Sequence, residues 1–406
     1  MPSRRHLQAR VGIAVCLLLA CAIETRAQEP SAETTEGAPV RDVLSFLLTN
    51  RAVDTGDFTR DAQATASAAD AVTRLLQAEL TTLPLGSSSA GFTYRLNPAV
   101  GTIERSSQSF GPLFAERSLT AGRGRLSLGM TLQFTSYSRL DDVDLDSGTL
   151  VTVANQFRDE SEPFDSETLA LEIRSRTATF LGTVGVTDWL DVSVAVPVVS
   201  LELEGQRTNT YRGEDVLQAT GIAEATGLGD MAIRAKVRLF GATGSGLALL
   251  GETRLPTGRE EDLLGSGEAS FSAMLVGSYE PGLLAFHGNV GLVRGGLLDE
   301  VGMRGAATFS PSPRVTLLAE VVGRHITGIG RLTLQSAPHP TVDGVDTFRL
   351  ITSDAAINST VVTGGVRWNI AGSWLVNAAA TFPVVNQGLR PDPVVLVGLE
   401  YAFGGG

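Results

Sequence analysis

The sequence predicts an all-β protein: a transmembrane antiparallel β-barrel of about 12 strands, preceded by a short helical N-terminal segment. Three features of the 406-residue chain support this fold class. The C-terminal strand has one continuous apolar face, the N-terminus carries an export signal, and the connections between strands sort into short turns and long loops. Together these features are typical of a barrel that crosses a membrane with strands.

The C-terminal stretch Val394–Phe403 has the pattern of a lipid-facing strand. Every odd-numbered residue from Val395 to Phe403 is apolar, and strand side chains alternate between two faces. The apolar face ends in the aromatic pair Tyr401 and Phe403, as at a membrane interface. The spacing of Gly398, Tyr401 and Phe403 resembles the C-terminal signal by which barrel-insertion machinery recognises outer-membrane barrels.

The N-terminus predicts export through a cleaved signal peptide, residues 1–27. Arginines precede an apolar run over 11–23, and Thr25–Ala27 has the small residues of a cleavage site. The apolar run is too short to span a bilayer, so it favours export over anchoring. Leu18–Cys21 offers a second interpretation, because it resembles a lipobox in which Cys21 would be lipidated. Export together with the barrel pattern predicts the outer membrane of a Gram-negative bacterium.

Composition excludes several classes of function. Both cysteines, Cys16 and Cys21, lie in the predicted leader, so the processed chain would hold no disulfide and no thiolate metal site. The net charge of −12 makes the protein a poor nucleic-acid binder. The length would allow several soluble domains, but a single large barrel is the simpler account. The oligomeric state stays open.

Residues 28–119 lack the barrel pattern and form the predicted N-terminal segment. A stretch rich in Glu, Thr, Ser and Pro over 28–40 reads as a disordered leader. Helices are expected at 41–50 and 58–83, where apolar residues recur near a helical period, followed by a small hairpin around Asn97. This segment could form a periplasmic cap, a plug inside the lumen or a partner-binding arm.

From Gly124 onward the chain alternates apolar and polar residues, and residues 120–406 are the predicted barrel. The expected strands are 124–138, 167–186, 189–205, 227–240, 246–257, 267–280, 283–294, 299–310, 313–326, 357–371, 373–384 and 392–403.

The connections between these strands fall into two classes. Thr187-Asp188 and Glu280–Gly282 are examples of tight turns. The alternate connections are mostly long, at 139–166, 206–226, 258–266, 327–356 and 385–391. Short turns on one side and long loops on the other are typical of an outer-membrane barrel.

If the apolar faces meet lipid, the polar faces line the lumen, because a charged side chain in hydrocarbon is costly. Two interpretations of the lumen remain open: a structural ladder of Arg–Glu pairs that fills a narrow barrel, or a conduit whose basic stripe guides polar or anionic solutes. The predicted lumen-lining residues are Arg125, Glu172, Arg174, Arg176, Arg234, Lys236, Arg238, Glu252, Arg254, Glu320, Arg324, Arg367 and Glu400.

The sequence predicts no metal, no cofactor and no catalytic site. His287, His325 and His339 stand apart without metal-ligand spacing. An outer-membrane phospholipase is also a barrel of this size, but its His-x-Ser pair is replaced here by His287-Gly-Asn289, which lacks the nucleophilic serine.

The acidic run Asp142-x-Asp144-x-Asp146 superficially resembles a calcium loop. The glycine is misplaced, and the twelfth position is Val153 instead of glutamate. A solvated acidic loop is therefore the preferred interpretation.

Four glycine-rich stretches stand in order along the predicted barrel: Phe110–Pro112 through Glu116 to Gly124, Gly185–Asp191 with Pro197, Gly227–Asp230, and Leu255–Gly258 followed by Gly265–Gly267. Together they resemble the phenol-degradation meta-pathway transporter-like family, over Phe110 to Phe403. The resemblance implies an outer-membrane barrel associated with uptake of aromatic or other hydrophobic compounds.

The predicted function is an outer-membrane channel or transporter for small molecules, with outer-membrane lipid, the insertion machinery and a small-molecule solute as partners. A hydrophobic solute would need an apolar pocket or a lateral opening, for which Pro197 and a kink near Gly251 are candidates. The alternatives are a structural or ligand-binding barrel with a filled lumen and, less favoured, a lipid-acting enzyme.

Overall fold

The computed structural model describes residues 33–49, 53–82, 85–97, 102–141, 143–242, 244–385 and 387–403. The predicted signal peptide with Cys21, the residue Asp142 and the terminal glycines lie outside these ranges. The expectations for them stay predictions.

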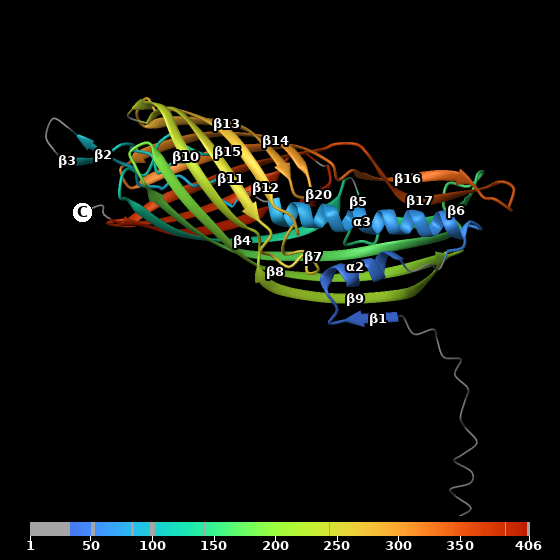
Figure 1. Cartoon of the computed structure of the whole chain (residues 1–406). Helices are drawn as coiled ribbons and strands as arrows, with labels where there is room; N and C mark the ends of the chain where they lie inside the picture. The colour runs from blue at the N-terminus through green and yellow to red at the C-terminus, as the bar shows by residue number, and fades with distance from the viewer. Residues whose placement is uncertain are drawn as a thin grey trace, which may run out of the picture. The chain divides into compact units, whose positions relative to one another are not determined.

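Twelve antiparallel strands close into a barrel (Figure 1), which confirms the predicted fold class. Each strand pairs with the next, and the last pairs with the first, for example with Val397 opposite Leu132. The strands are β4 (Leu126–Leu140), β7 (Asp165–Gly185), β8 (Leu190–Tyr211), β10 (Met231–Ala242), β11 (Ser245–Leu255), β12 (Ser270–Tyr279), β13 (Leu284–Gly295), β14 (Asp299–Ser312), β15 (Val315–Thr327), β18 (Ile357–Ala371), β19 (Trp374–Pro383) and β21 (Val394–Phe403).

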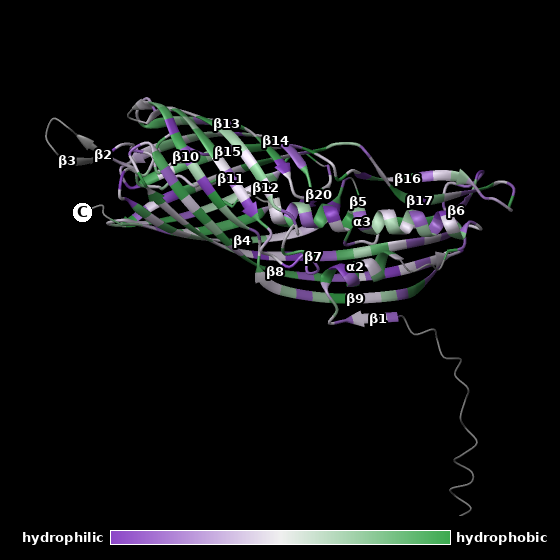
Figure 2. Cartoon of the chain, in the orientation of Figure 1, coloured by the Kyte–Doolittle hydropathy of each residue, from purple (hydrophilic) through white to green (hydrophobic). Residues whose placement is uncertain are grey.

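Apolar residues are spread along the barrel strands (Figure 2), and many of them are exposed on the outside of the barrel. Across three neighbouring strands, Leu275, Val290 and Met303 lie opposite one another and are 45%, 48% and 63% exposed. A row of exposed apolar side chains is costly in water and favourable in lipid. The outward residues of the twelve strands therefore form an apolar belt.

Several predicted long loops are strands that continue beyond the barrel. We call the end of the barrel with connections such as 186–189 and 280–283 the turn end, and the opposite end the loop end. At the loop end the long strands β7 and β8 run on and form an extension sheet with the order β9-β8-β7-β6-β17-β16. The additional strands are β5 (Val143–Asp144), β6 (Leu150–Phe157), β9 (Glu214–Leu228), β16 (Arg331–Pro338), β17 (Val345–Ser353) and β20 (Leu389–Pro391), and β1 (Glu33–Glu36) precedes the helices.

Strands β9 and β10 form one interrupted strand along β8. Val198 of β8 pairs with Leu228 of β9, and Ala195 of β8 pairs with Ala232 of β10. The interruption falls at Gly229-Asp230, where the barrel ends and the extension sheet begins.

Helices α2 (Val40–Thr49) and α3 (Phe58–Thr82) confirm the predicted helical pieces, and they pack against the inner face of the extension sheet. Asp57 caps α3, since its Oδ1 accepts a hydrogen bond from the Arg60 amide at 3.1 Å. Buried apolar side chains join the helices to the sheet: Val43, Leu44, Leu47, Val72, Leu75 and Leu76 meet Leu169, Leu171, Ile173, Leu201, Leu203 and Leu350. Among the described helices, none is long and apolar enough to cross a membrane.

After α3 the chain passes through the ring of barrel strands. We call residues 85–93 and 106–121 the lumen segment, because their contacts are with inward-facing side chains of the barrel. Between its two halves, β2 (Tyr94–Asn97) and β3 (Thr102–Arg105) form the predicted hairpin near the turn end (Figure 1). The sequence left the position of this segment open, and the predicted boundaries at 27 and 119 stay predictions.

A charge on the apolar belt should destabilise the folded barrel. Val290→Arg places a cation in the middle of the belt, at a cost of about 2–4 kcal/mol near a bilayer midplane. Val216→Arg is the matched control, because Val216 is 37% exposed but lies on β9 of the extension sheet. Urea unfolding in lipid vesicles should show a lower midpoint for Val290→Arg alone. Equal midpoints for the two variants would contradict a lipid-facing belt.

Candidate functional site: the lumen wall and the lumen segment

The inward face of the barrel carries buried charged side chains. On β10, for example, Arg234 and Lys236 are 3% and 1% exposed, while Ile233 between its buried neighbours points outward. Most of the predicted lumen residues also point inward: Arg125, Arg238, Glu252, Arg254, Glu320, Arg324, Arg367 and Glu400.

The prediction for Glu172, Arg174 and Arg176 is wrong. These residues lie on the outward face of β7, on the same side as the exposed Phe180, and they form surface ion pairs. The inward positions between them are Ile173 and neighbouring residues that pack on the helices. In this half of β7 the polar side chains point outward and the apolar ones point inward, the reverse of the barrel. The reason is that this half lies beyond the apolar belt, with water outside and apolar helices inside.

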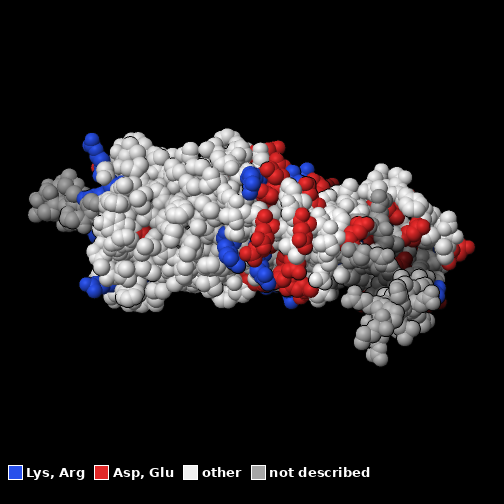
Figure 3. Space-filling model, turned by 90° about the horizontal axis from the view of Figure 1, so that it is seen from below, with Lys and Arg blue, Asp and Glu red and all other residues white. Residues whose placement is uncertain are grey.

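Figure 3 shows the result on the surface, where an uncharged stretch gives way to rows of acidic and basic side chains. Glu202 and Glu224 of the extension sheet belong to this charged face, and they lie opposite each other on β8 and β9.

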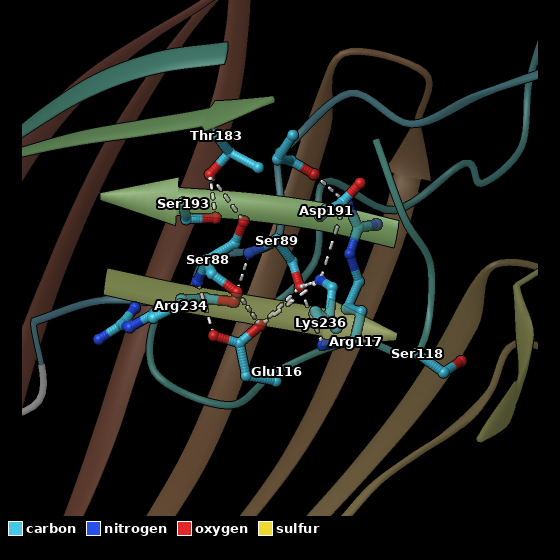
Figure 4. A network of polar contacts seen from close by, with 12 residues as sticks. Ser88, Ser89, Glu116, Arg117, Ser118, Thr183, Asp191, Ser193, Arg234 and Lys236 are labelled. Carbon is cyan, nitrogen blue, oxygen red and sulfur yellow. Dashed lines mark hydrogen bonds and ion pairs between the residues drawn. The ribbon is translucent and has the colours of Figure 1, made fainter. Parts of the chain in front are cut away.

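A buried carboxylate of the lumen segment, Glu116, forms the centre of a polar network (Figure 4). Its carboxylate accepts hydrogen bonds from the Ser88 amide at 2.6 Å and from the Ser89 hydroxyl at 2.8 Å. The Lys236 ammonium lies 3.6 Å from the carboxylate and donates to the Ser89 hydroxyl at 2.7 Å. On the other side, Lys236 lies 4.0 Å from Asp191 of β8. The network thus joins both halves of the lumen segment to the wall.

A wall carboxylate, Glu320 on β15, binds the backbone of the lumen segment. It accepts hydrogen bonds from the amides of Leu113, Phe114 and Ala115 at 2.5, 2.9 and 2.8 Å. Three consecutive amides around one anion resemble the concave anion sites that backbone N–H groups form elsewhere. Asn289 of β13 reinforces the contact, since its side chain bonds both the amide and the carbonyl of residue 116.

The first half of the lumen segment is held by Glu400 on β21. Its carboxylate accepts from the Gly91 amide at 2.7 Å and pairs with Arg367 at 2.6 Å. A Cβ on residue 91 would lie 2.4 Å from a Leu375 methyl carbon, so the close approach requires glycine. The backbone of the lumen segment therefore lies in direct contact with the wall side chains at this point.

The wall arginines donate to backbone carbonyls of the N-terminal region. Arg234 donates to the Gly86 carbonyl at 2.6 Å, and Arg304 donates to the Phe114 carbonyl at 2.9 Å. Arg367 donates to the carbonyls of residues 110 and 112 at 2.6 and 3.3 Å, and Arg254 donates to that of residue 81, at the end of α3.

The end of α3 meets a second charged group at the loop end. Arg324 on β15 lies 2.8 Å from Glu300 and 3.4 Å from Glu79 of α3. Burial raises the pKa of the Glu79 carboxyl, and the neighbouring Arg324 guanidinium opposes that rise.

The helices are tied to the extension sheet by ion pairs of their own. Arg349 of β17 lies 2.5 Å from Asp61 of α3, with both side chains almost fully buried. Arg207 of β8 pairs with Glu167 at 2.9 Å and donates to the Leu47 carbonyl at the end of α2. These ion pairs and hydrogen bonds fix the orientation of the helices on the sheet, which apolar packing alone does not specify.

The cavities that remain inside the barrel are small. One of 60 Å³ lies between the lumen segment and β4, β7 and β21, and another of 50 Å³ lies beside Arg234, Arg254 and Arg304. A larger cavity of 580 Å³ lies outside the barrel lumen, between α2, α3 and the loops around Glu260 and Gly296. Both small cavities adjoin the lumen segment, which lies inside the barrel in this structure.

The stretches Gly227–Asp230, Leu255–Gly258 and Gly265–Gly267 meet at one point of the wall. The Asp230 carboxylate accepts from the Gly258 amide at 3.1 Å and from the Ser266 amide at 2.8 Å. Together the three stretches close the wall at the position where β9 ends and β10 begins.

The two candidate positions for a lateral opening are closed. The carbonyl of Pro197 accepts from the Gly229 amide at 2.9 Å beside this junction. The expected kink near Gly251 is wrong, because the residue pairs in register with Ala235 and Ala273 on both sides.

The proposed insertion signal lies on the last strand. Tyr401 packs on Trp374 and Phe403, with ring centroids 4.7 and 4.6 Å apart. Gly398 faces Asn377, and a Cβ there would lie 2.6 Å from the amide of that side chain. Recognition of these residues by insertion machinery stays a prediction.

The residues considered for other chemistry lie apart. His287 is buried and faces the lumen, with Nδ1 3.0 Å from the Ser278 hydroxyl. In the described part of the chain no cluster of His, Cys, Asp and Glu could hold a metal ion. Asp144 bonds Ser147 within its own loop.

Three functional residues were missed at the sequence level. Arg304 and Asp191 could have been found, because each alternates with outward apolar residues such as Met303 and Val194. Glu116 lies in an irregular segment and carries no periodic signal.

No family model matches the sequence, and no curated protein matches it. Membership of the phenol-degradation family therefore stays a prediction. Solved structures match in fold. An outer membrane channel from Pseudomonas putida F1 is 10% identical, with 70% of this chain and 98% of that chain covered and a TM-score of 0.43.

The transport unit of the autotransporter AIDA-I from Escherichia coli is 11% identical, covers 68% and 90%, and scores 0.38. OmpF from Salmonella typhi is 8% identical, covers 69% and 98%, and scores 0.28. At these identities and TM-scores the likeness carries no argument about what this chain does, and its closed barrel rests on its own strand pairing.

Removing the charge of Glu320 should loosen the lumen segment. In Glu320→Gln the neutral amide accepts more weakly, and one of its groups can only donate toward the three amides. A loss of about 1–3 kcal/mol is expected for a buried group left without its partner. Hydrogen exchange of amides 113–115 should accelerate, while Glu224→Gln on the outer surface should leave it unchanged. Unchanged exchange in Glu320→Gln would contradict the anchoring role.

Proposed function

We propose that this protein is an outer-membrane channel for small molecules whose lumen is closed in this state by the lumen segment. Passage requires the segment to leave its position. Outer-membrane lipid surrounds the apolar belt, the turn end faces the periplasm, and residues 1–27 direct export.

The observation that carries the proposal is the polarity of the wall behind the segment. A barrel that only had to be filled could use apolar side chains, because replacing buried ion pairs by apolar groups is often neutral or stabilising. Here Arg234, Lys236, Arg367, Glu320 and Glu400 line the wall, and the segment binds them through replaceable hydrogen bonds. Such a charged wall suits a lumen that is filled with water when the lumen segment has left it.

The second candidate is a structural or ligand-binding barrel with a permanently filled lumen. The small volumes of the two described internal cavities, 50 and 60 Å³, favour it. The two candidates differ in one property, which is whether the lumen segment moves.

The solute class implied by the family resemblance, aromatic or other hydrophobic compounds, rests on that resemblance alone. A lipid-acting enzyme is less favoured, because His287 faces the lumen and the serine of a His-x-Ser pair is replaced by Asn289.

A reversible tether of the lumen segment tests the channel proposal. The Ser109 hydroxyl of the segment lies 2.8 Å from the Thr308 hydroxyl of β14, so Ser109→Cys with Thr308→Cys would form a disulfide on oxidation. We expect oxidation to stop solute flux into liposomes, and reduction to restore it, because the tethered segment cannot leave.

The matched control joins two wall strands and leaves the segment free. Thr363 and Thr381 lie opposite each other on β18 and β19, with hydroxyls 2.8 Å apart. Their double cysteine variant should conduct in both redox states. Flux that is absent from the native chain and from both reduced variants would overturn the channel and leave the filled barrel.

A further inference from the structure

Backbone carbonyls of the lumen segment and of the end of α3 accept hydrogen bonds from a cluster of cations in the wall. Arg234, Arg254 and Arg304 come from β10, β11 and β14 and line one internal cavity of 50 Å³, together with Ser270 and Ser272. Each donates to a backbone carbonyl of residues 81–114: Arg234 to residue 86, Arg254 to residue 81 and Arg304 to residue 114. We call these three residues the arginine cluster.

Wall carboxylates do not balance this cluster. Glu252 lies 2.5 Å from Arg234 and 2.8 Å from Arg254, so one carboxylate serves two guanidinium groups. Glu300 in the same cavity is engaged by Arg324 at 2.8 Å. Arg304 has the Phe114 carbonyl as its described hydrogen-bond acceptor, and no wall carboxylate within ion-pair distance among the described contacts.

The same imbalance holds along the whole wall of the described barrel strands. Inward-facing cations outnumber inward-facing carboxylates, and Glu116, which neutralises Lys236, belongs to the segment and would leave with it. The cations are Arg125, Arg234, Lys236, Arg238, Arg254, Arg304, Arg324 and Arg367; the carboxylates are Asp191, Asp230, Glu252, Glu280, Glu300, Glu320 and Glu400.

We propose that the arginine cluster is an anion-binding site of the open lumen, and that the solutes of the channel are small anions such as carboxylates. This inference rests on the proposed channel function and adds its charge preference. The carbonyls of the lumen segment stand where solute oxygens would lie, because a guanidinium that donates to a carbonyl donates more strongly to a carboxylate. A narrow lumen with excess positive charge also concentrates anions by its field.

The hydrogen bonds of the arginine cluster explain how the barrel can exchange between a closed state, with the lumen segment in place, and an open state without it. When the lumen segment leaves, Arg234 loses the carbonyl of residue 86 and keeps Glu252, while Arg304 loses the Phe114 carbonyl, its described acceptor, which is costly for a buried group. Water and an entering anion supply new acceptors at the same guanidinium groups. An anion therefore favours the open state as well as passing through it.

The test measures the reversal potential of the full-length protein in a planar lipid bilayer under a potassium chloride gradient. We expect a chloride preference in the native chain. Arg304→Gln should reduce or abolish that preference, and Arg304→Lys, which keeps the charge, should retain it. Arg294→Gln is the matched control, because Arg294 is 60% exposed on β13 and points away from the lumen.

A second measurement uses glutamate and lysine as solutes of similar size and opposite charge in liposome flux. Faster entry of glutamate is expected, with the difference lost in Arg304→Gln. Conductance with a potassium preference, or with no change in Arg304→Gln, would overturn this inference and leave the channel standing. An absence of current in the native chain would overturn the channel function, and the anion site with it.

Discussion

The structure depends on one constraint: polar groups inside a closed barrel must find partners there. The wall of this barrel buries guanidinium, ammonium and carboxylate groups, and an unpaired buried charge is costly. The chain meets this constraint with its own backbone. Carbonyls of the lumen segment accept from Arg234 and Arg367, and its amides donate to Glu320 and Glu400. A segment without regular structure suits this role, since its backbone groups are not used in a helix or sheet.

The N-terminal region is held by two kinds of interaction, and the difference matters for movement. The helices are held by apolar burial against the extension sheet, which contributes about 25 cal/mol for each Å² removed from water. The lumen segment is held largely by hydrogen bonds to charged wall groups, which contribute about 1.5–3 kcal/mol each, and water can replace the partner in each of them. Phe92 and Phe110 add a small apolar contact near the turn end. The segment can therefore exchange its partners while α2 and α3 stay docked.

The twelve strands could be predicted because a membrane imposes one rule on every strand. Lipid requires apolar side chains at alternate positions, as in Leu128 to Phe134 of β4, and the alternation fixes which face points inward. The rule holds only inside the belt. Along β7 this rule fails on the loop-end side of Phe180, because Ile173 packs on the helices inside while Arg174 is exposed to water outside. A sequence shows the alternation but not where lipid ends.

The position of the lumen segment could not be predicted for a different physical reason. Its contacts are long-range and irregular: the Gly91 amide donates to Glu400, and Glu116 meets Lys236. No local pattern in 85–121 encodes these partners, and only the buried charges of the wall showed that partners were needed. From the sequence, two interpretations of those charges stayed open: a filled ladder, which was favoured, and a conduit.

The structure relates those two interpretations to each other. Without the lumen segment the ladder of Arg–Glu pairs in the wall is incomplete. Glu252 pairs with two arginines, and Arg304 donates to a carbonyl of the lumen segment. A wall that evolved only to be filled would gain from one more carboxylate at that point, which would pair Arg304 within the wall itself. The excess of cations is therefore better explained by what the wall contacts when the segment is absent.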